Sequence, residues 1–182
     1  MNETVNRGSL YFEKKKIKWV LLVLLVSIGA FLVSKSFFFI SLFLLISIFF
    51  YMLISRLRFS VGLEFVTIST ILIGAAYGPF AGILMGVVGR LIEAFSTRRL
   101  FSLPVTLPLY ALLGYFAGVY AGTNIVLFGI VLSVLYAIAS GVLTFLLLGG
   151  RLRKVMTFLI IEVIINVLFF INIAPFMLNV MK

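Results

Sequence analysis

Four ionisable side chains stand inside otherwise apolar stretches of this sequence: Glu64, Arg90, Glu93 and Glu162. A charge at membrane depth costs roughly 2.5–3.5 kcal/mol or more, so such residues usually pair with one another or line a cavity. Arg90 and Glu93 are three positions apart, which places them on one face of a helix where they can form an ion pair. Asn166 follows Glu162 by one helical turn. These five residues are therefore the candidate ligand-binding residues of the chain.

The five residues admit two interpretations. Glu64 lies 14 positions before Gly78 and Arg90 lies 12 positions after it, so the two should reach similar depths on facing helices. The structural interpretation is a neutralising network of Glu64, Arg90 and Glu93 that holds the helices together. The functional interpretation is a polar pocket or an ion path, in which Arg90 holds an anionic group or pairs with Glu64, while Asn166 hydrogen-bonds the ligand. Three glutamates against one arginine leave excess negative charge, so either one carboxyl is protonated or a cationic or amine-bearing ligand belongs there.

The missing residue types argue against most enzymatic chemistry. The chain has no Cys and no His, and all five of its acidic residues are Glu. The usual zinc ligand sets and the Ser-His-Asp and Cys-His nucleophilic systems are therefore absent. Mg²⁺ and phosphoryl-transfer sites normally use Asp, which argues against an ATPase or kinase. We therefore predict no catalytic residues, no metal, no cofactor and no enzymatic activity.

The overall composition indicates a membrane protein. Apolar residues make up 64% of the chain and charged residues 11%, and the mean hydropathy is +1.31. A soluble domain is nearer half apolar and a quarter charged. The net charge of +10 is read as a mark of cytoplasmic loops, not as a nucleic-acid-binding surface.

These residues must be positioned by helices that cross the bilayer. A hydropathy window of about 19 residues finds seven apolar segments, at 17–34, 37–55, 61–77, 79–97, 103–122, 124–148 and 155–178. Segment 61–77 is the shortest and most polar at its start. The expected fold is all-α, a polytopic transmembrane helical bundle of six to seven spans. Residues 1–16 form a basic cytoplasmic tail, and 17–182 form a single transmembrane domain.

The distribution of positive charge predicts the topology. Twelve Lys and Arg residues fall in the tail and the connections on one side of the predicted membrane, and two fall on the other side. Because basic residues mark cytoplasmic loops, we expect a multi-pass protein of the cell membrane with its N-terminus in the cytoplasm. Lys35 and Lys182 are the two residues on the outer side.

Glycine and proline mark where the helices meet and where they begin or bend. Glycines repeat at a spacing of about four in two segments, as Gly78, Gly82 and Gly86 and as Gly114, Gly118 and Gly122. This spacing clears one face of a helix for close approach, which favours helix packing and leaves docking of a partner protein as the functional alternative. Pro79 and Pro104 fit helix starts. Pro175 should break or bend the end of the last segment.

One stretch of the chain resembles a known family. The pattern is Leu72-x-x-x-x-Tyr77-Gly78-Pro79-x-x-Gly82-x-x-x-Gly86, and near the C-terminus stands "IEVIINVLFFINIAPFML". Together they resemble the substrate-binding S component of energy-coupling factor (ECF) transporters over the last five helices. The resemblance implies a membrane subunit that captures a vitamin-like small molecule. It also implies a coupling membrane protein and ATPases supplied in trans, with the bilayer as the surrounding partner.

Two alternatives stand beside that reading. The chain is also similar to MreD-like rod-shape proteins, which implies a structural or interaction protein of a prokaryotic cell envelope without transport. A cation-coupled carrier that uses Glu64, Glu93 and Glu162 is the third possibility. The side of the membrane on which the Gly-Pro turn lies is a point of conflict. The charge distribution puts the turn outside, whereas the S-component family puts it in the cytoplasm.

Overall fold

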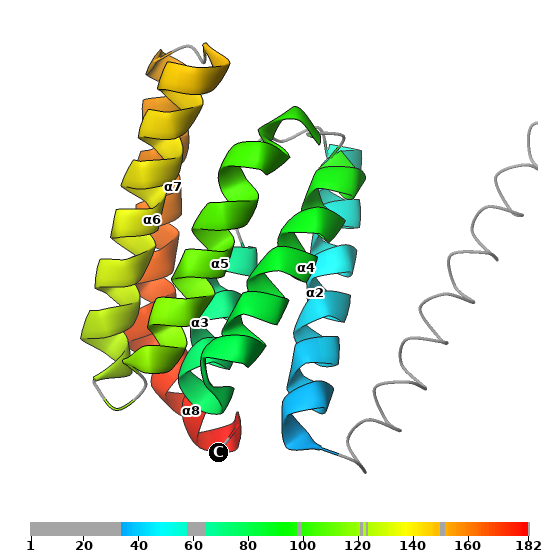
Figure 1. Cartoon of the computed structure of the whole chain (residues 1–182), viewed down its shortest axis with the longest axis vertical. Coiled ribbons are helices and arrows are strands. Elements are labelled where there is room, and N and C mark those ends of the chain that lie inside the picture. Colours follow the sequence, from blue (N-terminus) through cyan, green and yellow to red (C-terminus); the bar gives the residue numbers. More distant parts are fainter. Residues whose placement is uncertain are drawn as a thin grey trace, which may run out of the picture.

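The computed structural model of the chain describes residues 34–57, 65–97, 100–120, 122, 124–149 and 152–181. Every element in these ranges is helical, and they contain no strand. The helices are α2 (Lys35–Leu57), α3 (Phe65–Tyr77), α4 (Pro79–Thr97), η1 (Leu100–Ser102), α5 (Leu103–Val119), α6 (Ile125–Leu148), α7 (Leu152–Asn172) and α8 (Ala174–Met181). Figure 1 shows them as one bundle of roughly parallel and antiparallel helices.

The predicted all-α fold is confirmed for the described residues. The predicted segment 79–97 coincides with α4, and 124–148 matches α6 to within one residue. The predicted tail 1–16 and the first predicted segment, 17–34, lie outside the described residues except for Ser34. Glu64 also lies outside them.

The described helices are compatible with a multi-pass membrane protein. Four stretches are long and apolar enough to cross a bilayer, in α2, in α4, in η1 with α5, and in α6. The pair α7 and α8 meets the same criterion as one bent unit, which raises the number of candidate spans to five. The expectation of six to seven spans stays a prediction, because the first predicted segment is not described.

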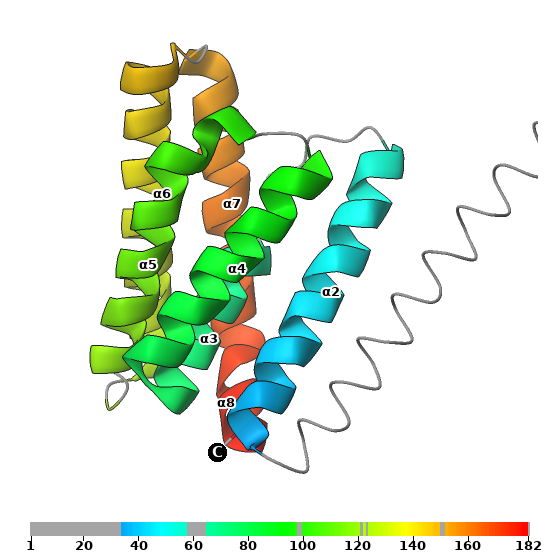
Figure 2. The same ribbon diagram turned by 45° about the vertical axis from the view of Figure 1, so that its right-hand side comes forward.

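Helix α3 is the centre of the bundle, and its described part, Phe65–Tyr77, is shorter than a full span. Its 13 residues extend about 20 Å at 1.5 Å per residue, against a hydrocarbon core of about 30 Å. Every residue from Val66 to Ala75 is buried, because α2, α4, α5, α6 and α8 all pack against this helix. Figure 2 shows α3 behind α4, enclosed by its neighbours.

The glycines allow α3, α4 and α5 to touch backbone to backbone. A Cβ added at Gly82 would lie 2.5 Å from the carbonyl oxygen of Gly114, and one at Gly86 would lie 2.8 Å from that of Tyr110. A Cβ at Gly118 would collide with the backbone of Pro79. Small residues at such contacts let membrane helices approach closely. The contact fixes the register of α4 against α5, and with it the position of the polar residues above it.

Two breaks in the helices occur at the predicted turns. Gly78 has φ = +93° and connects α3 to α4, a conformation that side-chain-bearing residues avoid. Pro79 then starts α4, where its missing N–H is not needed. The predicted break near Pro175 is also present, since α7 ends at Asn172 and α8 continues at an angle of 57°.

Candidate functional site

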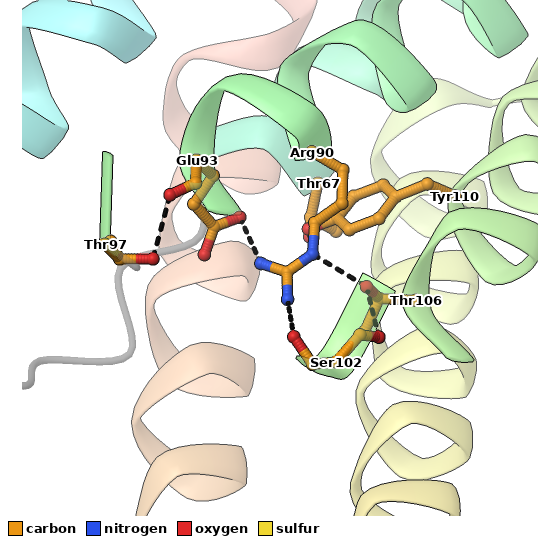
Figure 3. Close-up of polar contacts among 7 residues, drawn as sticks. All are labelled: Thr67, Arg90, Glu93, Thr97, Ser102, Thr106 and Tyr110. Carbon is orange, nitrogen blue, oxygen red and sulfur yellow. Dashed lines mark hydrogen bonds and ion pairs between the residues drawn. The ribbon is translucent and has the colours of Figure 1, made fainter. Parts of the chain in front are cut away.

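The guanidinium of Arg90 is the centre of a buried polar cluster. Its Nη1 lies 2.7 Å from the Oε2 of Glu93, and both side chains are only 5% exposed. Its Nε donates to the hydroxyl of Thr106 at 2.8 Å, and its Nη2 donates to the hydroxyl of Ser102 at 2.8 Å. Figure 3 shows the three contacts fanning out from one planar group. We call Arg90, Glu93, Ser102 and Thr106 the Arg90 cluster.

The Arg90 cluster ties α4 to the start of α5. Thr106 uses its own hydrogen to donate to the backbone oxygen of Ser102 at 3.0 Å, so its oxygen is free to accept from Arg90. Each of the three guanidinium nitrogens therefore has a partner within the chain. The charge of Arg90 is balanced by Glu93 one turn away, as expected for an ionisable pair at membrane depth. This geometry suits a helix-joining function for Arg90 better than capture of an anionic ligand.

A second polar group crosses the centre of the bundle and was not among the predicted site residues. The hydroxyls of Thr67 on α3 and Tyr110 on α5 lie 3.2 Å apart. The ring of Tyr110 also meets that of Tyr136 on α6, with centroids 4.7 Å apart. All three side chains are buried. The sequence offered little signal for them, since single Thr and Tyr residues are common in membrane helices.

Glu162 and Asn166 lie on one buried face of α7, which continues at Phe170. Each of these residues is four positions from the next, and none is more than 1% exposed. The Phe170 ring packs against Gly129 of α6 and fixes the register of these antiparallel helices. The same register places Ser133 level with Asn166 and Ala137 level with Glu162. A face of small α6 residues therefore lies opposite the polar face of α7.

Asn166 carries a buried hydrogen-bond donor that the described part of the chain does not satisfy. Its Nδ2 has no hydrogen-bond partner among the described residues, although the side chain is 1% exposed. Leaving such a donor unpaired costs roughly 1–3 kcal/mol. By contrast, Asn172 near the end of the same helix is exposed, and its Nδ2 donates to the oxygen of Leu168 at 2.8 Å. A protein atom that is buried at this cost is a candidate for ligand contact.

The structure divides the predicted site residues into two groups. Arg90 and Glu93 pair on α4, whereas Glu162 and Asn166 belong to α7, which packs chiefly against α6 and α8. Glu64 lies outside the described residues, so the predicted Glu64–Arg90 contact stays a prediction. The described residues contain no group of three carboxylates that could hold a metal ion.

The structure places the predicted glycine residues in three kinds of position. Gly82, Gly86, Gly114 and Gly118 lie at helix contacts, and Gly78 forms the turn. Gly122 lies beyond the end of α5, where an added Cβ would meet nothing within 4 Å.

Comparison of the chain with protein-family models, with curated proteins and with solved structures gave no match.

Proposed function

We propose that this protein is a membrane-embedded, solute-binding subunit of a small-molecule uptake transporter. The observation that carries the proposal is the buried amide of Asn166, whose donor has no partner among the described residues. One turn away on the same face stands the buried carboxyl group of Glu162. A donor and a carboxyl group held inside an apolar bundle match the few convergent polar groups that a small-molecule site uses to orient its ligand.

The polar face of α7 is the binding face in this proposal. Asn166 hydrogen-bonds the solute, and Glu162 accepts from a donor of the solute. Tyr136 and Tyr110 lie near the level of Glu162, because the register set by Phe170 and Gly129 brings Tyr136 opposite residue 163. The Arg90 cluster holds α4 and α5 together beside this face and does not contact the solute.

Energy for uptake would come from partners in trans. The chain has no phosphate-binding loop of its own, and the resemblance to S components implies a coupling membrane protein with ATPases. The apolar outer surface of the bundle, which includes Leu127, Leu135 and Leu146 of α6, is suited to lipid or to such a membrane partner. The basic connections face the cytoplasm in this proposal, where ATPases would dock.

Native mass spectrometry on the protein extracted from its own membranes in mild detergent tests the proposal. The wild-type protein should retain a small molecule, or an ATPase module, or both. Asn166→Ala should lose the small molecule, and Asn172→Ala, an exposed asparagine on the same helix, should keep it. A wild-type protein that carries neither a small molecule nor an ATPase would contradict the proposal.

A structural protein of the envelope, similar to the MreD type, is the second candidate. The observation in its favour is the Arg90 cluster, in which each guanidinium nitrogen of Arg90 already bonds within the chain. In this case the cluster and the glycine contacts exist to make a rigid bundle, and the partners are other envelope proteins. Recovery of the protein with such partners, with no ligand and no ATPase, would favour this candidate.

A further inference from the structure

Helix α8 covers one end of the bundle. It packs against α2, α3, α6 and α7, and Figures 1 and 2 both place it below α3, at the end where α2 begins. Ala174, Leu178 and Met181 form its buried face, at a spacing of four and three positions. On the opposite face Phe176 and Val180 are exposed. An eight-residue helix is a small element, and this one is anchored by a single buried face.

One hydrogen bond joins the far end of α8 to the centre of the bundle. The hydroxyl of Tyr77 donates to the backbone oxygen of Met181 at 2.8 Å, across 104 positions in the sequence. The ring of Tyr77 is held in place by stacking against Phe39 of α2, with centroids 6.3 Å apart. Tyr77 is also the last residue of α3, immediately before the Gly78 turn. We call the bond between Tyr77 and Met181 the latch.

The connection between α7 and α8 can act as a hinge. The helix is interrupted at Ile173, which is exposed, and the two parts meet at 57°. Pro175 has no backbone N–H and cannot make the bond that would continue α7 through the break. Ile173 itself keeps its helical bonds, since its N–H donates to the oxygen of Phe169 at 2.8 Å and its oxygen accepts from the N–H of Met177 at 3.0 Å. A short terminal helix beyond such a bend opens at lower free energy than the core.

The polar face of α7 ends at α8. Asn166, Phe170 and Ala174 follow one another at intervals of four, so the face that carries the Asn166 amide leads directly to the first buried residue of α8. Access to the amide from the Gly78 end therefore passes both α8 and the buried ring of Phe170.

We propose that α8 is a gate, hinged at Ile173 and held shut by the latch, which closes the Gly78 end of the bundle over the polar face of α7. Its purpose rests on the proposed solute-binding function, but its opening does not require a ligand. The gate and the solute site can therefore fail independently in experiment.

Thiol labelling tests the gate because the chain has no cysteine. Ser133→Cys introduces a near-isosteric thiol at a fully buried position level with Asn166. In membranes, a membrane-impermeant maleimide should label this thiol slowly in the otherwise wild-type protein. Tyr77→Phe removes the latch and keeps the ring, and should increase the labelling rate about two- to tenfold, the factor that one such hydrogen bond contributes. Tyr115→Phe, at an exposed tyrosine of α5, should leave the rate unchanged.

Two further thiols distinguish gate opening from general loosening. Ser69→Cys reports from the fully buried face of α3, and its labelling should not change when Tyr77→Phe is added. Asn179→Cys is exposed on α8 and identifies the side of the membrane on which the gate lies. The faster labelling of Ser133→Cys should come from that same side.

Three results would overturn the gate. The first is an unchanged labelling rate of Ser133→Cys in the Tyr77→Phe protein. The second is an equal increase at Ser69→Cys, which would mean that the whole bundle had loosened. The third is faster labelling from the side opposite α8. An Asn166→Ala protein that kept its small molecule would instead contradict the solute site and leave the gate standing.

Discussion

Replacing Arg90 by methionine tests whether the Arg90 cluster is a structural joint. Methionine keeps the length of the aliphatic stem and removes the guanidinium, with its ion pair to Glu93 and its bonds to Thr106 and Ser102. The principal loss is electrostatic, because the carboxylate of Glu93 is left buried without its countercharge. Breaking one side of a buried pair costs about 3–5 kcal/mol.

The double variant Arg90→Met, Glu93→Gln should recover most of that loss. It removes the uncompensated charge, and Thr106 still donates to the oxygen of Ser102. The hydroxyl of Ser102 is then the principal group that lost a partner, at about 1 kcal/mol. We therefore expect the double variant to be about 2–4 kcal/mol more stable than Arg90→Met.

Unfolding in mixed micelles of a mild detergent and sodium dodecyl sulfate, followed by far-ultraviolet circular dichroism, measures both variants. Asn179→Ala, on the exposed face of α8, is the control and should unfold within about 0.5 kcal/mol of wild type. If Arg90→Met were as stable as wild type, or if the double variant were less stable than the single one, the reasoning would be refuted. A stable Arg90→Met protein that lost its ligand would make Arg90 a binding residue instead.

Two further outcomes are expected from the same titration. Gly82→Ala should lose about 2 kcal/mol of stability, because its Cβ would lie 2.5 Å from the Gly114 oxygen and helix backbones cannot give way as a side chain can. Gly122→Ala is the control: its Cβ would lie in open space, so stability should change by less than about 0.5 kcal/mol. Asn166→Leu should raise stability by about 1–2 kcal/mol, since an apolar group of similar size replaces a buried Nδ2 donor that has no partner among the described residues. It should also abolish ligand retention in native mass spectrometry. A loss of stability in Asn166→Leu would mean that the amide has a partner outside the described residues.

The helices were largely predictable because their signals are local. Long apolar runs predict membrane helices, and the segment 79–97 was placed with the same bounds as α4. Proline and glycine mark ends for steric reasons that hold in any context, which is why the Gly78 turn and the break near Pro175 were both expected. The pairing of Arg90 with Glu93 follows from helical periodicity alone.

Which of these residues contact one another depends on how the helices pack. Ser102 and Thr106 reach Arg90 only because the glycine contact sets the register of α4 against α5. Glu162 and Asn166 belong to α7, which packs chiefly against α6 and α8, and no pattern in the sequence names these neighbours. Depth in the membrane is a one-dimensional quantity, and it does not say around which side of a bundle a residue faces.

The latch is the contact that local sequence patterns predict least well. Tyr77 and Met181 are 104 positions apart, and neither has a sequence pattern that pairs it with the other. Their contact depends on the direction that α8 takes after Ile173, which is chosen by burial of Ala174, Leu178 and Met181 among four other helices. The helices, their breaks and their apolar character were predictable from local patterns, since these features follow from forces within about one turn of the chain. Which polar groups face one another was decided by packing, because that is a property of all the helices together.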